Sequence, residues 1–270
     1  MGLGYMHYMG TSNFASVRYG MGATPHSAWS AGVRFLSYGA IDGYDEMGTP
    51  TGQFHPQDLV VDALYSHDIN DRWRGGITMK FVYSHYDRYE AVALAADLGV
   101  NYYDPERDFS FSAVIKNAGG QLKRFDRHYD RLPFDIQLGM TKGLGATPFQ
   151  LNVTATHLTK WKLPYYEHKD ENGVDDQVKK DGFVSNFFRH LIFGLQFAPS
   201  EHFYAALAYN YKTRSDMATY QRNFLSGFSA GLGFRVRAMG FGVAYAMPHK
   251  KASSIMVNFS LNIFEVIPKD

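Results

Sequence analysis

The strongest constraint on the fold of this chain is an alternation of apolar and polar residues that recurs along nearly its whole length. In the stretch 132–142, apolar side chains occupy every second position, at Phe134, Ile136, Leu138 and Met140. A period of two places successive side chains on opposite faces of an extended chain. Each such stretch is therefore predicted to be a β-strand with one apolar face and one polar face.

Fourteen segments of this kind follow one another along the 270 residues. Most have a length close to the roughly 9–11 residues with which a tilted strand crosses a bilayer. An even number is what bacterial single-chain membrane barrels have. The predicted strands are 3–8, 12–20, 28–41, 56–69, 73–85, 90–104, 108–118, 131–142, 148–160, 189–198, 202–213, 226–237, 239–247 and 254–264.

The connections between these strands alternate in length after the first pair, apart from 9–11 and 86–89, which are short although they lie on the side of the long loops. The long ones are 42–55, 119–130, 161–188, 214–225 and 248–253, whereas tight turns at 69–72, 104–107 and 199–201 carry Asn, Asp and Pro. Membrane barrels show this asymmetry, with short periplasmic turns and long outer loops. A soluble β-sandwich also alternates along its strands, but it has no reason to alternate its loop lengths.

Composition supports a membrane barrel over the soluble alternative, although the mean hydropathy of −0.29 fits both. Aromatic residues make up 16 % of the chain, as expected where two interfacial girdles are present. The net charge of +1 does not indicate nucleic-acid binding, and the absence of cysteine excludes disulfides and thiolate metal sites. We therefore predict one all-β domain over 1–270, a transmembrane antiparallel up-and-down barrel of about fourteen strands.

Charged residues within the predicted strands fall on the polar rows, which are expected to face the lumen. A Lys or Arg on the lipid row near the bilayer midplane would cost about 2–4 kcal/mol. The last strand, 254–264, is expected to pair with the first, with Phe264 at the periplasmic belt. The residues expected to point inward are Lys80, Asp97, Lys116, Asp135 and Arg235.

Two motifs could indicate a catalytic site or a calcium site, but both are better explained as ordinary strand and loop sequence. The match to G-x-S-x-G at 227–231 places Ser229 inside a continuing strand pattern, whereas a hydrolase elbow needs a strand, a turn and a helix. The acidic stretch 170–176 lacks the spacing and the closing Glu of a calcium-binding loop. We therefore expect no catalytic, cofactor-binding or metal-binding residues, and a protein that is not an enzyme.

Several longer blocks resemble the PorQ family, barrel proteins of the type IX secretion system of Bacteroidota. They keep the family's order across most of the chain, and the pattern Lys-Asn-x-Gly-x-Gln-Leu-Lys is more specific than alternation alone. The blocks are 101–106, 114–123, 132–139, 155–158, 189–194, 203–204 and 227–229.

The resemblance implies a non-enzymatic role at the bacterial outer membrane, with the long loops facing the cell surface. Such proteins hold the attachment complex that fixes secreted cargo to the surface, and the implied partners are a PorZ-like surface protein and PorU- and PorV-like components. The family belongs to the fatty-acid-transporter class of barrels. Its signal peptide and N-terminal plug-like segment are not found here, so the chain is expected to start at the first strand.

The same class leaves a second function open, the transport of hydrophobic solutes across the outer membrane. Such a transporter needs an apolar inner pocket, whereas the inward rows are expected to be polar or small, which favours the anchoring role. For that role the longest loop, 161–188, is the candidate docking site, because aromatic anchors beside a charged rim are typical of interfaces. The candidate anchors are Trp161, Tyr165 and Tyr166, and a solvated loop without a partner is the alternative.

Overall fold

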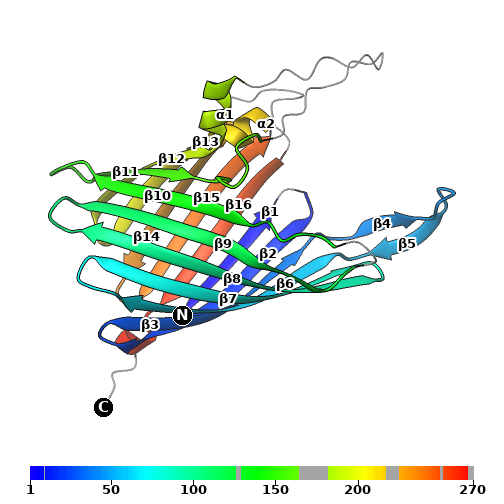
Figure 1. Cartoon of the computed structure of the whole chain (residues 1–270), viewed down its shortest axis with the longest axis horizontal. Coiled ribbons are helices and arrows are strands. Elements are labelled where there is room, and N and C mark those ends of the chain that lie inside the picture. Colours follow the sequence, from blue (N-terminus) through cyan, green and yellow to red (C-terminus); the bar gives the residue numbers. More distant parts are fainter. Residues whose placement is uncertain (9, 126–128, 164–181, 217–224, 250–251, 267–270) are drawn as a thin grey trace.

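The chain forms one closed antiparallel β-barrel of fourteen strands, with a small two-stranded sheet outside it (Figure 1). The computed structural model describes residues 1–270 except 9, 126–128, 164–181, 217–224, 250–251 and 267–270. The predicted fold class, a transmembrane antiparallel barrel with long loops at one end and short turns at the other, is confirmed.

The strands follow the sequence order around the barrel, apart from β4 and β5, which form the separate sheet. None of the helices in the described part of the chain is long and apolar enough to cross a membrane. The elements are β1 (Gly2–Tyr8), β2 (Ser12–Thr24), β3 (Ser27–Ser37), β4 (Ile41–Tyr44), β5 (Pro50–Phe54), β6 (Gln57–Asp68), β7 (Trp73–Tyr86), β8 (Tyr89–Asp104), β9 (Phe109–Lys123), β10 (Asp135–Gly143), β11 (Phe149–Ala155), α1 (Phe183–Arg189), β12 (Leu191–Ser200), β13 (Phe203–Asn210), α2 (Tyr211–Asp216), β14 (Phe228–Val236), β15 (Met239–His249), β16 (Ala252–Leu261) and α3 (Ile263–Val266).

The barrel is closed by pairing between its first and last strands, as the sequence predicts. The register runs from Gly2 opposite Ser260 to His7 opposite Ile255. The amino group of Met1 adds a hydrogen bond of 2.8 Å to the carbonyl oxygen of Leu261. Closure leaves no free edge in the barrel sheet, which is the condition for strands to cross hydrocarbon.

The two faces of the barrel wall differ in the way that a membrane protein requires. Large apolar side chains on the outward rows are exposed, for example Leu207 at 58 % and Leu232 at 57 %. Among the described residues, the buried apolar side chains are only Ala91, Ala93, Ala95 and Leu163. A soluble domain of this size would bury a large apolar core. Here the apolar surface points outward, so lipid takes the place of that core.

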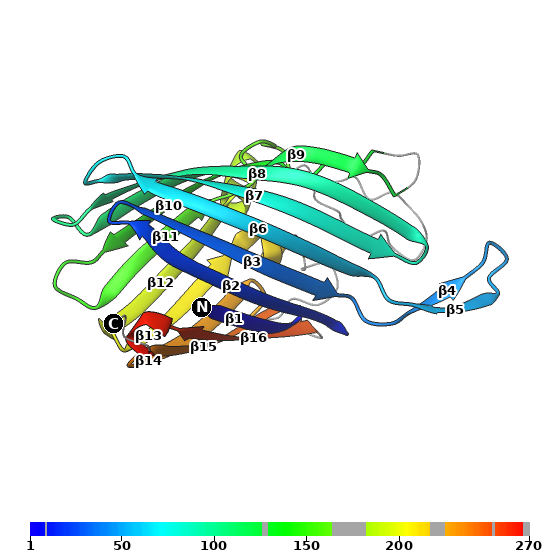
Figure 2. The same ribbon diagram turned by 90° about the horizontal axis from the view of Figure 1, so that it is seen from below.

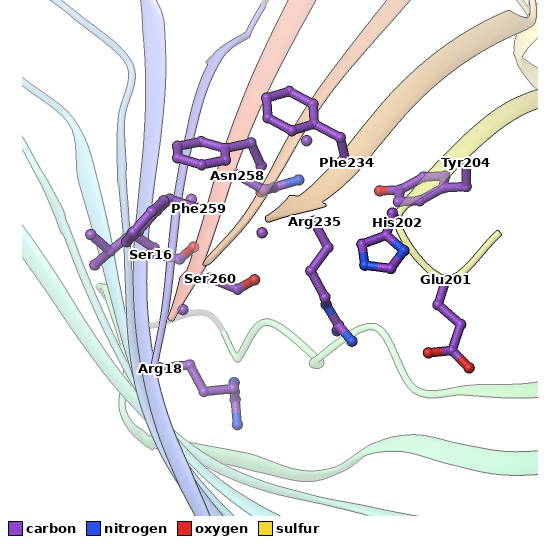
Figure 3. Close-up of a pocket in the computed structure, with 16 residues that line it drawn as sticks. Ser16, Arg18, Glu201, His202, Tyr204, Phe234, Arg235, Asn258, Phe259 and Ser260 are labelled. Carbon is purple, nitrogen blue, oxygen red and sulfur yellow. The ribbon is translucent and has the colours of Figure 1, made fainter. Parts of the chain in front are cut away.

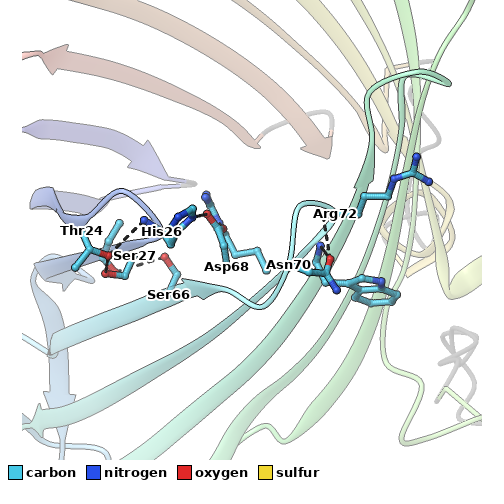
Figure 4. Close-up of polar contacts among 10 residues, drawn as sticks. Thr24, His26, Ser27, Ser66, Asp68, Asn70 and Arg72 are labelled. Atoms are coloured by element: carbon cyan, nitrogen blue, oxygen red, sulfur yellow. Dashed lines mark hydrogen bonds and ion pairs between the residues drawn. The ribbon is translucent and has the colours of Figure 1, made fainter.

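The turns β2–β3, β6–β7, β8–β9, β10–β11, β12–β13 and β14–β15 lie at the end of the barrel where the two termini lie, called here the short-turn end (Figure 1). The connections β1–β2, β7–β8 and β15–β16 are short as well but lie at the opposite end, so the connection predicted to be long over 248–253 is short. At the short-turn end, side chains hold neighbouring turns in place (Figure 4). Asn70 Oδ1 accepts hydrogen bonds of 3.0 Å from the backbone N–H groups of Arg72 and Trp73, which is an Asx-type turn. The N–H of Asp68 donates to the carbonyl oxygen of His26 at 2.8 Å and joins the β6–β7 turn to the β2–β3 turn.

The opposite end, called here the long-loop end, carries the connections between β3 and β6, β9 and β10, β11 and β12, and β13 and β14. The first of these contains the β4–β5 hairpin, which projects beyond the barrel wall (Figure 2). Backbone N–H groups of Thr49 and Met47 donate to the carboxylate of Asp45 at 2.7 and 2.9 Å and close the hairpin tip. These hydrogen bonds hold the pKa of Asp45 below its usual range.

The sequence prediction was wrong at several strand ends. The loop assigned to 42–55 contains β4 and β5, and β9 continues to Lys123 rather than ending at 118. Helix α2 takes the end of the strand predicted over 202–213, and α1 ends just before β12. Phe264 lies at the short-turn end, as expected, but within α3 and not in a strand. At strand ends, local capping and loop packing replace the hydrogen bonds between strands. The alternation of apolar and polar residues therefore no longer predicts where a strand ends.

We predict that replacing Leu207 by Arg, near the middle of β13 on the lipid face, lowers the free energy of unfolding in vesicles by about 2–4 kcal/mol. The matched control is Ala208→Arg, one residue further along the same strand. Ala208 shares the lumen-facing row of Ser229 and Gly194, so its guanidinium stays in a polar space and should cost less. Denaturant unfolding in lipid vesicles measures both, and equal losses would contradict the assignment of faces.

Candidate site in the barrel lumen

The polar rows of the strands line the lumen, and the five charged residues predicted to point inward do so. Their cross-strand neighbours all belong to the inward rows, because side chains directly opposite one another share a face. Arg235 is opposite Gly240, and Lys116 is opposite Asp135. Lys80 is opposite Asp62, and Asp97 is opposite Thr78. The predicted registers are thus confirmed at these positions.

The central ion cluster of the lumen joins β2, β3 and β6 through Asp62. This carboxylate is fully buried, and one of its oxygens forms an ion pair with Arg18. Its other oxygen lies 3.0 Å from Nη2 of Arg34. Two cations thus share one anion, and the side chains of both arginines stay more than a third exposed. The cluster has a net positive charge facing the interior.

A second ion pair, Lys80–Asp97, is organised by a β-bulge in β9. Asn117 occupies the bulge with a φ of 57°, a conformation that Asn adopts more readily than most residues. Its side-chain Oδ1 accepts a hydrogen bond of 3.0 Å from Lys80, and its backbone N–H donates to Asp97 at 2.8 Å. The bulge therefore joins three strands through one residue.

The lumen also has an apolar surface, called here the luminal apolar patch, that the sequence analysis missed. Met256, Met6, Phe14 and Leu36 follow one another on adjacent strands in register. Val60 and Val82 continue the surface across β6 and β7. Phe14, Leu36, Val60 and Val82 line a cavity of about 290 Å³ together with Arg34, Asp58, Ser84 and Tyr86. The expectation of uniformly polar or small inward rows was wrong, because segments such as 59–61 are apolar on both faces.

A larger cavity of about 680 Å³ lies toward the short-turn end (Figure 3). Glycines form much of its wall, with Arg18, Arg235, Asn258 and Ser260 among the polar side chains that line it. The ring of Tyr204 lies over Gly233, where a Cβ would overlap it. The glycines on the inward rows of β1 and β15 keep this side of the lumen open.

A third cluster, of aromatic side chains around Asp58, lies near the long-loop end at the base of the β4–β5 hairpin. Hydroxyl groups of Tyr38 and Tyr86 donate to the carboxylate of Asp58 at 2.7 and 3.0 Å. Phe125 stacks on Tyr86 with 5.0 Å between ring centroids. Burial raises the pKa of Tyr38, and its hydrogen bonds with Tyr86 and Asp58 raise it further. Tyr38 therefore stays protonated and fixes the start of the hairpin segment.

The candidate docking residue Trp161 lies outside the lumen, at the long-loop end. Its ring stacks on His190 with 5.1 Å between centroids and packs on Phe183 at 5.5 Å. Its carbonyl oxygen contacts Nε2 of His190 at 3.0 Å. Tyr165 and Tyr166, the other two candidates, lie outside the described residues, so the docking role of all three stays a prediction.

The G-x-S-x-G motif forms part of an ordinary strand in the structure. Ser229 lies in β14 between Ala208 and Ala246, within the strand that the alternation predicts. In the part of the chain that the structure describes, no group of three or more His, Asp or Glu side chains is arranged to hold a metal ion. The acidic stretch 170–176 lies outside the described residues.

The comparisons with known proteins show the fold. No family model matches the chain, and no curated relative was found. Among solved structures, a TodX monoaromatic hydrocarbon channel variant has a TM-score of 0.56 at 9 % identity, covering 97 % of this chain and 89 % of that one. The toluene transporter TbuX of Ralstonia pickettii has a TM-score of 0.52 at 9 % identity, with coverages of 96 % and 86 %. The CymD monoaromatic hydrocarbon channel has a TM-score of 0.51 at 10 % identity, with coverages of 96 % and 85 %.

We predict that Asp62→Asn destabilises the barrel, because it leaves Arg18 and Arg34 without their shared anion. Removing one partner of a fully buried ion pair costs about 3–5 kcal/mol. Both arginine side chains are partly exposed here, so we expect about 1–3 kcal/mol. The control Asp42→Asn alters an exposed carboxylate in the hairpin and should change the free energy of unfolding by no more than about 0.5 kcal/mol. An effect of Asp62→Asn as small as the control would show that the cluster is not structural.

Proposed function

We propose that this protein is a non-enzymatic channel of the bacterial outer membrane that passes hydrophobic solutes through its lumen. The luminal apolar patch carries this proposal. Apolar side chains facing a water-filled lumen cost free energy unless a ligand covers them, and hydrophobic pockets with a few polar groups are the usual form of small-molecule sites. Fold-level similarity to TodX and TbuX, whose names give them as a hydrocarbon channel and a toluene transporter, agrees with this function.

The lumen offers such a solute an ordered series of environments. The patch lies in the half of the barrel near the long-loop end, and the glycine-lined cavity lies toward the short-turn end. The Asp62 cluster stands between them, since Arg34 lines the cavity of the patch and Arg18 lines the glycine-lined one. In this proposal the long-loop end faces the cell surface, so a solute meets the patch first.

We expect Leu36→Asn to lower the uptake of an apolar probe such as toluene by about tenfold, which corresponds to about 1.4 kcal/mol. An amide on the patch weakens contact with the probe, while the conservative change Leu36→Met should keep most of the rate. Uptake of radiolabelled toluene by cells carrying each variant measures this. Equal uptake by Leu36→Asn and the unaltered protein, at equal amounts of folded barrel, would refute the proposed path.

The second candidate function is that of an anchor for the surface attachment complex of type IX secretion, with a PorZ-like protein as partner. Apart from the sequence blocks that resemble the PorQ family, one structural observation favours it. The β4–β5 hairpin projects from the long-loop end and exposes Tyr44 at 63 % and Met47 at 93 %. Exposed aromatic and Met side chains on a projecting element are well suited to contact a partner protein.

If this second function holds, the protein purified in mild detergent from outer membranes of its native host should bring down a large surface protein. The double variant Tyr44→Ser with Met47→Ser should lose that protein, because it removes the apolar contacts at the hairpin tip. The control Tyr65→Phe changes an outward side chain in the wall and should keep it. Recovery of no surface protein with the unaltered chain would argue against the anchoring role.

A further inference from the structure

Helix α1 is amphipathic in the reverse sense of a helix on a soluble protein. Its buried residues are polar, Asn186 and Arg189, and His190 directly after it is buried as well. The opposite side carries apolar residues in exposed positions, with Phe183 at 71 % and Val184 at 65 %. Surface helices in water place their polar face outward. The arrangement of α1 is therefore the one expected for a helix with an apolar environment outside the protein.

The buried polar face makes hydrogen bonds and ion pairs that hold the helix in this orientation. Arg189 pairs with Asp216 of α2 at 2.8 Å, and its guanidinium also donates to Ser215 at 2.6 Å. Asn186 accepts a hydrogen bond of 3.3 Å from the backbone N–H of Leu163. Rotating α1 to bury its aromatic side chains would leave these groups without partners, at a large cost for a buried cation.

The exposed face of α1 continues the lipid-facing surface of the barrel. The ring of Phe188 lies 6.3 Å from that of Phe193 in β12. Phe193 is on an outward row, since it is opposite Val153 and Tyr209 and alternates with the inward Gly194. Trp161 packs on Phe183, and Lys160 and Lys162 beside it are exposed. Tryptophan and lysine are typical of the region where acyl chains meet headgroups.

We propose that α1 is an interfacial membrane element, with Phe183, Val184, Phe187 and Phe188 among the acyl chains of the leaflet at the long-loop end. Figure 1 shows α1 beside α2, at the end of β12 and β13. Through the contact of Phe188 with Phe193, α1 extends the apolar surface of β12 at the long-loop end. Trp161 then belongs to the same interface, with its ring between the helix and the headgroups. The inference is independent of the solute or partner that the barrel serves.

The chain has no cysteine, so single-cysteine variants can each carry one nitroxide spin label. The test variants are Val184→Cys and Phe183→Cys, in vesicles of phosphatidylethanolamine and phosphatidylglycerol. Leu207→Cys on the lipid face is the hydrocarbon reference, and Tyr44→Cys on the hairpin is the aqueous reference. Electron paramagnetic resonance measures how far each label collides with oxygen, which concentrates in hydrocarbon, and with a nickel chelate, which stays in water.

We expect the labels at 183 and 184 to collide with oxygen and to exclude the chelate, as the label at 207 does. Chelate accessibility matching that at 44 would show that α1 lies in water and would overturn the proposal. Low accessibility to both reagents would show that protein covers the helix, and would overturn it as well. Val184→Cys alters a highly exposed side chain that makes no contact with the polar face, so it reports even where Phe183→Cys reduces the yield of folded barrel.

Discussion

The pairing of β1 with β16 is the interaction on which the rest of this structure depends. In hydrocarbon no water is available to pair with backbone N–H and C=O groups, so an open sheet edge is not tolerated. Six residue pairs from Gly2–Ser260 to His7–Ile255 remove that edge. Once the ladder is closed, every residue in the wall faces either lipid or the lumen. The identity of each side chain then decides the surface on which it can lie.

Closure also explains why polar residues carry the internal organisation of the protein. A packed apolar core is absent from the described residues, so specific contacts inside the barrel are made by ions and hydrogen bonds. Asp62 joins three strands, and the Asn117 bulge joins three others. Both lie where a displaced strand would leave a charge without a partner. They thereby fix the register of the wall, a task that apolar packing performs in soluble sheets.

Much of the barrel could be predicted because lipid imposes a simple rule on the sequence. Alternation located all fourteen strands and the inward direction of Lys80, Asp97 and Arg235. It failed where both faces carry apolar residues, as at Leu36 and Val60. In such a segment all the residues are apolar, so the sequence does not show which of them face the lumen. The prediction also missed Arg18, Arg34 and Asp62, although the same alternation places them on inward rows.

Other features depend on contacts between segments far apart in the chain, so no local sequence pattern predicts them. The block 114–123, one of those that resemble the PorQ family, has a physical basis in the β9 bulge. Asn117 adopts a positive φ there, and a Cβ at Gly119 would overlap the carbonyl oxygen of Leu94. Nothing local in the sequence shows that Lys80 completes this arrangement. Likewise, the reversed polarity of α1 follows from Asp216, which lies on a different connection.

The two candidate functions place their decisive residues on one continuous segment of chain. Leu36 lies in the luminal patch, and Tyr44 lies on the hairpin that follows it. Between them, Tyr38 is fixed by Asp58, which lines the same cavity as Leu36. The hairpin base and the patch therefore share a rigid boundary, yet their functional side chains point into different spaces. Substitutions at the hairpin tip can alter partner binding without changing the lumen, and substitutions at Leu36 can alter the lumen without changing the tip, so the two functions are separable by experiment.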